Sequence, residues 1–262
     1  ALVMVIITFF RKETRLTLRG LIDSLDGTVR SLVLVTMACA GAGVIIGSLT
    51  LTALGASFSY ALVQLSGGNL LVLLGLTALA CFIFGMVGSG IAAYLALSTL
   101  TAPAMVQMGV PLVAAHLFIV WWAITAYITP PVAIGVYAAS AIADSDIMKT
   151  GWWAVRLGVG TFIIPFMFVY RPALVMIGSA GDIIVATVIA FVGMTALSCG
   201  AVGWFWHKMN WGQRILFLAA GWLSVFPNII INMIGFALVA STVLWQLAER
   251  RGYIRGGTIV QA

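Results

Sequence analysis

Long apolar runs separated by short polar clusters make up most of the 262-residue chain. A helix needs about 20 apolar residues to cross the hydrocarbon core of a membrane, and residues 31–49 come close to that length. Further apolar runs occupy residues 112–143, 155–170, 184–206 and 215–247. The pattern predicts an all-α polytopic membrane protein with about seven or eight membrane-embedded segments, some of them half-spans.

Residues 11–30 are the main polar segment near the start of the chain. They hold five basic residues and an apolar face at helical spacing, which predicts an amphipathic helix in the membrane interface. A solvated linker helix is the alternative. The basic residues indicate that this side faces the cytoplasm. Residues 1–10 are apolar but reach only half of a crossing, so we expect the chain to begin partway through a helix.

Two interruptions break the apolar region in the middle of the chain. The first, at residues 85–90, has glycine at three of six positions, and each glycine costs about 1 kcal/mol of helix propensity relative to alanine. The second is Thr129 followed by Pro130 and Pro131, where two backbone donors are missing. Residues 70–84 reach the first break in too few residues to cross, which predicts a re-entrant hairpin with its tip there.

The second break interrupts a predicted helix near its middle. Broken backbone at membrane depth is tolerated only against protein or a water-filled cavity, and secondary transporters build ion and solute sites from such half-helix ends. We therefore interpret the chain as part of a transporter. The alternative is that both breaks are structural kinks, since glycine and proline are frequent in membrane helices.

The chemistry of the breaks favours a hard cation, because unwound backbone presents free oxygen atoms. The carbonyls of Ala126 and Tyr127 lose their helical partners, since prolines lie four residues further on, and a half-helix that stops there frees those of Ile128 and Thr129. The predicted cation-binding residues offer carbonyl or hydroxyl oxygens and are Gly85, Gly88, Ser89, Ile128 and Thr129. Three residues are predicted to shape the broken helices: Gly90, Pro130 and Pro131. Trp122 and Tyr127 are candidates for a solute path, with packing as the alternative.

Proton coupling is the competing mechanism. No Asp or Glu lies well inside a predicted span, where a proton relay would need one. His116 is the titratable candidate, and a lone histidine near a helix start is more often a packing residue. The three cysteines stand alone in apolar runs without metal-ligand spacing. Sodium is therefore the predicted coupling ion, and no other cofactor is predicted.

Composition narrows the class of protein. Hydrophobic residues make up 63% of the chain and charged residues only 8%, against about 25% charged in soluble domains. The net charge of +6 lies in clusters outside the apolar runs, which indicates contact with an anionic bilayer rather than with nucleic acid. A membrane-embedded enzyme is the second functional class, but the spans contain no HExxH, Asp pair or Ser/Lys dyad.

Several motifs in a fixed order carry a family resemblance. They are the glycine-rich break, AAHLF at residues 114–118, ITPPV at residues 128–132, and MKTG with AVRLG within residues 148–158. In this order they resemble the large membrane subunit of TRAP (tripartite ATP-independent periplasmic) transporters, most closely the fused permeases of the TAXI subclass. The resemblance covers residues 16–174, and the remainder resembles the extra C-terminal helices of such permeases.

The resemblance implies an elevator-type, cation-coupled carrier in the cytoplasmic (inner) membrane of a bacterium or archaeon. Such a carrier imports an organic-acid-type solute that an extracytoplasmic binding protein delivers. The family has two inverted repeats, each with one pair of breaks, and this chain holds one pair. We therefore expect residues 31–174 to be the C-terminal repeat of the transport domain.

The same comparison predicts how the chain is divided. Residues 1–30 are expected to be a helix end plus the interfacial helix, and residues 175–262 to be additional transmembrane helices and a basic tail. Further partners are then the remaining half of the permease and a small-subunit-like portion.

The first break departs from the family pattern. The family reads GMGLPTT there, and this chain has GMVGSGI at residues 85–91. The proline and both threonines are absent, while Ser89 offers a hydroxyl and the glycines leave the backbone carbonyls free. The alternative function is a degenerate, non-transporting assembly subunit of such a permease.

Overall fold

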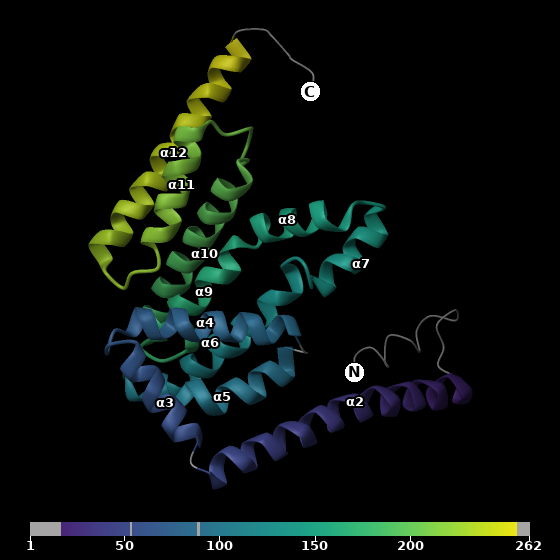
Figure 1. Ribbon diagram of the computed structural model, residues 1–262. Coiled ribbons are helices and arrows are strands. Elements are labelled where there is room, and N and C mark those ends of the chain that lie inside the picture. The colour runs from purple at the N-terminus through teal and green to yellow at the C-terminus, as the bar shows by residue number, and fades with distance from the viewer. Residues whose placement is uncertain (1–16, 53, 88–89, 256–262) are drawn as a thin grey trace. The chain divides into compact units, whose positions relative to one another are not determined.

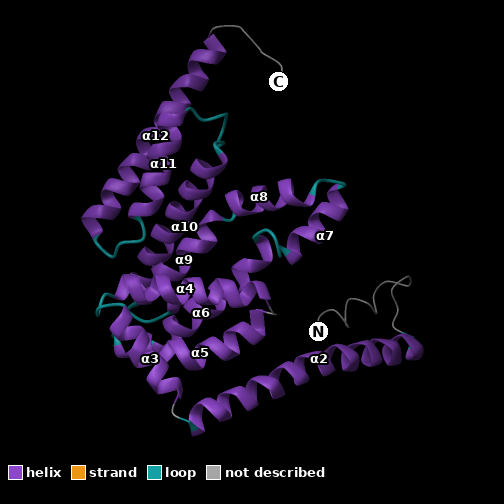
Figure 2. Cartoon of the chain, in the orientation of Figure 1, coloured by secondary structure: helices purple, strands orange, loops and turns teal. Residues whose placement is uncertain are grey.

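The computed structural model describes residues 17–52, 54–87 and 90–255 (Figure 1). Within these residues the chain consists of helices joined by turns and loops, without a β-strand (Figure 2). The predicted all-α polytopic membrane fold is confirmed. The chain divides into two compact units, residues 1–52 and residues 53–262.

The described part of the first unit is one long helix, α2 (Leu18–Leu51). The sequence pattern predicts an interfacial helix followed by a separate span from residue 31, and the structure corrects this, because α2 runs through the junction without a break. No proline interrupts the helix there, and Arg30 forms an ion pair with Asp26 one turn earlier, at 2.8 Å. Residues 11–16 lie outside the described residues.

The second unit contains the remaining helices. In chain order they are α3 (Leu54–Leu65), α4 (Leu70–Val87), α5 (Gly90–Gln107), α6 (Leu112–Thr125), the 3₁₀ turn η2 (Ala126–Ile128), α7 (Ile134–Ala143), α8 (Ile147–Leu157), α9 (Val159–Tyr170), the 3₁₀ turn η3 (Pro172–Val175), α10 (Ala180–Val202), α11 (Trp211–Leu223) and α12 (Ile229–Arg255). The sequence predicts that Phe226, Pro227 and Asn228 divide the last apolar run, and this is confirmed, since they lie between α11 and α12.

The sequence predicts that the helix after the first break ends at Pro103. This is wrong, because Pro103 lies inside α5, and membrane helices tolerate a proline when the freed backbone groups are satisfied nearby. The apolar run 155–170 is predicted to be one span with a kink at Pro165; in the structure the chain is divided at Gly158, where α8 ends and α9 begins, and Pro165 lies inside α9. A Cβ atom at Gly158 would lie 2.9 Å from the Ile128 side chain, so glycine allows close packing at this junction.

Helix α6 lies at the centre of the second unit, where it contacts α4, α5 and α9. Its Phe118 and Ile119 are fully buried in one apolar cluster with Leu73 and Leu74 of α4 and Met105 of α5. Both predicted breaks lie at ends of these packed helices. The core therefore determines where the breaks lie relative to each other.

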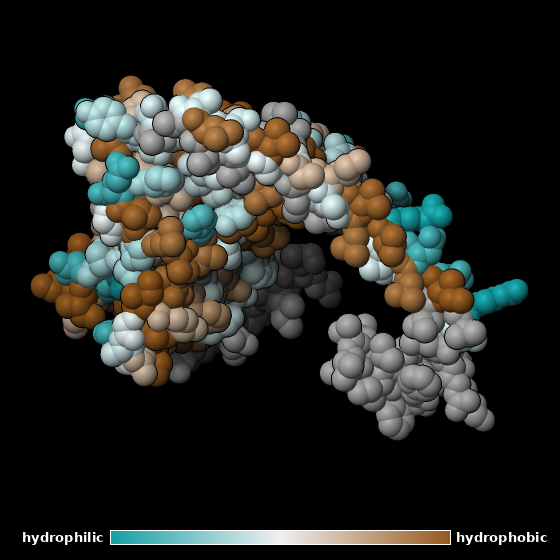
Figure 3. Space-filling view, turned by 90° about the horizontal axis from the view of Figure 1, so that it is seen from below, coloured by the Kyte–Doolittle hydropathy of each residue, from teal (hydrophilic) through white to brown (hydrophobic). Residues whose placement is uncertain are grey.

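Large apolar side chains cover much of the exposed surface. Phe191 of α10, Trp211 of α11 and Met233 of α12 are 74%, 73% and 65% exposed, and hydrophobic residues form broad patches on the face seen in Figure 3. Soluble proteins rarely expose such patches, which mark contact surfaces for partners or membranes. Among the described residues, four stretches are long and apolar enough to cross a membrane: Gly90–Gln107, Ile147–Tyr170, Ala180–Val202 and Ile229–Glu249.

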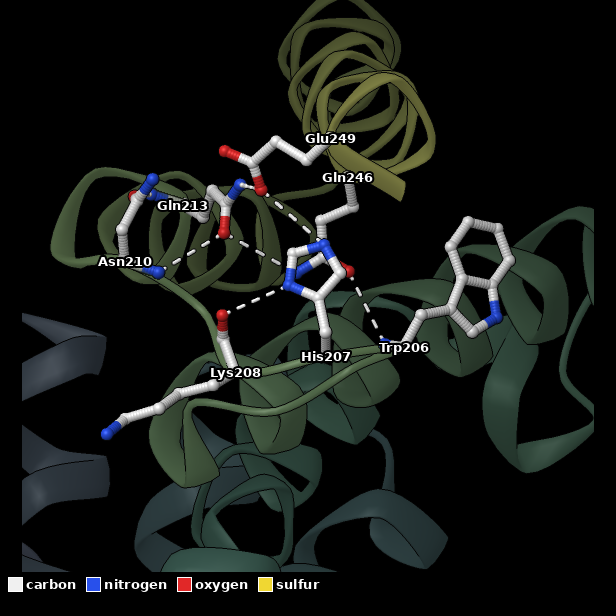
Figure 4. A network of polar contacts seen from close by, with 7 residues as sticks. All are labelled: Trp206, His207, Lys208, Asn210, Gln213, Gln246 and Glu249. Atoms are coloured by element: carbon white, nitrogen blue, oxygen red, sulfur yellow. Dashed lines mark hydrogen bonds and ion pairs between the residues drawn. The ribbon is translucent and has the colours of Figure 1, made fainter. Parts of the chain in front are cut away.

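A polar network closes one end of the α10–α12 bundle (Figure 4). The fully buried Gln213 donates from its amide to Glu249, at 3.1 Å, and accepts from the backbone N–H of Asn210, at 3.2 Å, and from Gln246, at 3.5 Å. His207 lies 3.5 Å from the same Glu249 carboxylate. The network ties the α10–α11 loop to the C-terminal part of α12.

Replacing Gln213 with leucine is expected to destabilise the bundle. The change leaves the buried amide of Gln246 without this partner, and an unpaired buried polar group costs about 1–3 kcal/mol. A melting temperature lower by roughly 2–8 °C, measured in detergent or nanodiscs, is the expected result. Gln64→Leu, at an exposed position of α3, is the matched control. Equal melting temperatures of the two variants would contradict the role given to Gln213.

Candidate functional site

The first break forms the tip of a helical hairpin. Helix α4 ends at Val87, α5 begins at Gly90, and the two helices pack against each other. The helical-hairpin part of the prediction is confirmed. Gly88 and Ser89, two of the predicted cation ligands, lie outside the described residues.

The second break lies between α6 and α7, as predicted. After α6 the chain tightens into the 3₁₀ turn η2, passes through an extended Thr129 and the cis Pro130–Pro131 peptide bond, and reaches Ala133. Ala133 adopts the left-handed conformation, with φ of 32°, directly before α7. The helix is therefore broken over five residues, 129–133.

The oxygens available at the second break differ in part from those predicted. The carbonyl of Ala126 accepts the Thr129 N–H, at 3.2 Å, and that of Thr129 accepts the Ala133 N–H, at 3.0 Å. Neither is free, because the 3₁₀ turn and the left-handed residue bring new donors into reach. The carbonyls of Tyr127 and Ile128 receive no backbone hydrogen bond from the described part of the chain. Pro131, four residues after Tyr127, has no N–H, and the helix ends at Ile128 before the N–H of Val132 can reach the Ile128 carbonyl.

Thr129, the residue after Ile128, carries a hydroxyl. Its Oγ1 donates to the carbonyl of Thr125, at 2.8 Å, and its lone pairs remain available as acceptors. The side chain is half-buried. Two neutral carbonyls and one hydroxyl oxygen are the kind of ligands that hard cations prefer.

The two breaks lie against each other, although they are far apart in the sequence. Gly85 in the last turn of α4 packs so closely on α6 that a Cβ atom there would overlap the carbonyl oxygen of Ala123. At the start of α5, the N–H of Gly90 donates to the Tyr127 hydroxyl at 2.7 Å. The structure therefore brings the predicted Gly85 and Gly90 together with the predicted second-break residues.

Helix α8 supports the second break from another side. A Cβ atom at Gly151 would lie 2.6 Å from the ring of Pro130, and one at Gly158 would lie 2.9 Å from Ile128. The seven-residue spacing puts both glycines on one face of a helical segment. Sequence reasoning missed these two residues, although their seven-residue spacing was a signal that could have identified them. Pro131 is exposed.

Trp122 and Tyr127, the predicted solute-path residues, have different surroundings. The Trp122 ring packs against Phe82, Phe162 and Phe166 at centroid distances of 5.7–6.3 Å, and its buried Nε1 has no hydrogen-bond partner in the described part of the chain. Tyr127 points its hydroxyl at Gly90. A solute path along either residue stays a prediction.

His116 lies away from the breaks, in the second turn of α6. Its Nδ1 is 3.1 Å from the hydroxyl of Tyr94 on α5, and the two rings meet edge to face. The described residues contain no group of three or more His, Cys, Asp or Glu side chains that could hold a metal ion. The donors around the two breaks are thus neutral oxygens rather than carboxylates or imidazoles.

The broken helix and the paired hairpin can be compared with known families. The family model of the tripartite ATP-independent periplasmic transporter DctM component matches residues 1–183. The chain belongs to this family. Searches of curated proteins and of solved structures found no match. The DctM match includes both breaks and ends within α10, so most of the α10–α12 bundle lies beyond it.

Membership in the DctM family makes this chain a multi-pass membrane component of a TRAP transporter. The DctM family is a family of transporter components and not an enzyme family. A TRAP large component works with a periplasmic binding protein and a small membrane subunit. The two breaks are then features of a transport protein.

Proposed function

We propose that this chain forms the ion-binding half-site of a sodium-coupled TRAP permease that imports organic acids by an elevator motion. The observation that supports the proposal is the contact between the two breaks, in which the N–H of Gly90 donates to the Tyr127 hydroxyl and Gly85 packs against Ala123. An ion held there would bridge the hairpin and the broken helix. Solute release is then coupled to ion release, because the ion and the solute each stabilise the arrangement in which the hairpin contacts the broken helix.

Helix dipoles support a cation at this place. The C-terminal end of α4 and the end of α6 with η2 both reach the contact between the breaks. Helix C-termini carry a partial negative charge of about half an elementary charge. These two ends and the neutral oxygens favour a monovalent cation without a buried carboxylate, against the partial positive charge of the α5 N-terminus at Gly90.

The remaining parts of the proposal extend the family assignment. The chain contributes the C-terminal repeat of a TAXI-type fused permease in a bacterial or archaeal inner membrane, and α10–α12 are its additional helices. Its partners are the other repeat, a small-subunit-like portion and the binding protein that delivers the solute.

The test is uptake into vesicles that hold the complete permease and its binding protein. A panel of radiolabelled mono- and dicarboxylates is offered in sodium buffer and in choline buffer. Replacing sodium with choline is expected to lower the initial rate by about tenfold or more, within the range of linked binding sites. Equal rates in both buffers would overturn sodium coupling. No uptake of any solute would favour a non-transporting assembly subunit instead.

A further inference from the structure

The hydrogen bond between Tyr127 and Gly90 joins the two breaks directly. Tyr127 is the middle residue of η2, and Gly90 is the first residue of α5, 37 positions earlier in the chain. The first N–H groups of a helix have no partner inside the helix. The Tyr127 hydroxyl oxygen accepts one of these N–H groups at 2.7 Å.

The surroundings of Gly90 fit this bond closely. Gly90 is buried, and a Cβ atom there would lie 3.1 Å from the Tyr127 hydroxyl oxygen and 3.2 Å from the Ile124 side chain. These separations are tighter than ordinary van der Waals contact, so glycine lets the start of α5 approach the phenol. The start of α5 therefore contacts the broken helix through one specific hydrogen bond.

We propose that Tyr127 is a positioning residue, whose hydroxyl holds the start of α5 against η2 at the second break. We call this hydrogen bond between Tyr127 and Gly90 the latch. This inference rests on the proposed ion site, because the bond holds the start of α5 against η2, directly before the second break. The hydroxyl acts through the backbone of Gly90 and need not touch the ion. Removal of the hydroxyl lets the start of α5 leave η2 more often and weakens sodium binding at the second break.

A second tyrosine supplies a matched comparison. Tyr94 lies on α5, one turn after Gly90, and its hydroxyl is 3.1 Å from Nδ1 of His116 on α6. Tyr94→Phe therefore removes a bond between α5 and α6, whereas Tyr127→Phe removes one between α5 and η2.

The test is hydrogen–deuterium exchange of the complete permease in nanodiscs, followed by mass spectrometry of the peptides that contain Gly90. Wild type, Tyr127→Phe and Tyr94→Phe are compared in choline chloride and over a series of sodium chloride concentrations. In choline, Tyr127→Phe is expected to speed exchange of these peptides by about three- to tenfold, as the loss of one hydrogen bond predicts. Tyr94→Phe is expected to leave the first amides of α5 unchanged.

The sodium series measures the positioning role. The half-saturating sodium concentration for protection of these peptides is expected to rise by about three- to tenfold in Tyr127→Phe, with full protection still reached at saturation. Unchanged exchange in choline would overturn the latch. Faster exchange with an unaltered half-saturating concentration would overturn its positioning role. If sodium protects no wild-type peptide, the proposed ion site fails, while the result in choline still decides whether the latch exists.

Discussion

A Gly85→Val permease is expected to have lost sodium-dependent uptake. The added side chain has no room, because a Cβ atom at Gly85 would overlap the carbonyl oxygen of Ala123 and lie 3.1 Å from its carbonyl carbon. Backbone atoms of a packed helix cannot rotate away as a flexible side chain can. Overpacking costs about 1–3 kcal/mol and sometimes more, so α4 and α6 must separate where the two breaks meet.

Uptake in sodium buffer and the amount of folded permease in the membrane are the measurements for Gly85→Val. Gly75→Val is the matched control, since Gly75 lies in the same helix, is exposed, and has no atom within 4 Å of an added Cβ. The control is expected to transport at close to the wild-type rate. Wild-type transport by Gly85→Val would show that the close contact between α4 and α6 is dispensable.

The second large effect is expected for Thr129→Ala. The substitution removes the hydroxyl of the residue that follows the unpaired carbonyls of Tyr127 and Ile128, together with its bond to Thr125. Interactions with charged groups contribute about 1.5–3 kcal/mol, so the half-saturating sodium concentration for uptake is expected to rise by roughly 10- to 100-fold. The maximal rate at saturating sodium should fall less.

Two controls separate ion binding from local stability. Thr129→Ser keeps the hydroxyl and is expected to restore most of the sodium affinity. Thr187→Ala is the control for the lost hydrogen bond. The Thr187 hydroxyl donates to the carbonyl four residues earlier in α10, at 2.7 Å, and the Thr129 hydroxyl makes the same kind of bond to Thr125. An altered sodium dependence in Thr187→Ala, or an unaltered sodium dependence in Thr129→Ala, would contradict a role of Thr129 in the ion site.

Both breaks could be predicted from the sequence because their causes are local. Three glycines within six residues weaken a helix wherever they occur, and Pro130 and Pro131 remove donors in any surroundings. The same reasoning correctly placed the division of the last apolar run at Pro227. A proline does not end every helix in which it occurs, since α5 continues through Pro103.

The hydrogen bonds at the second break were predicted only in part. Proline chemistry correctly indicated that the carbonyl of Tyr127 loses its helical partner, and the expected end of the half-helix correctly indicated that the carbonyl of Ile128 does too. The carbonyls of Ala126 and Thr129 are paired because the chain tightens into a 3₁₀ turn and Ala133 adopts a positive φ. Those dihedral angles depend on how α7 and α8 pack, which no local motif specifies.

The sequence by itself determined the class of protein, the two breaks and the transporter family, because hydrophobicity, backbone donors and motif order are properties of neighbouring residues. Only the tertiary structure decided that the breaks touch, through Gly85 on Ala123 and Gly90 on Tyr127. These contacts arise from the packing of α4 and α5 around the buried α6. Contacts between residues so distant in the chain depend on the whole core, and so they leave no pattern in a local stretch of sequence.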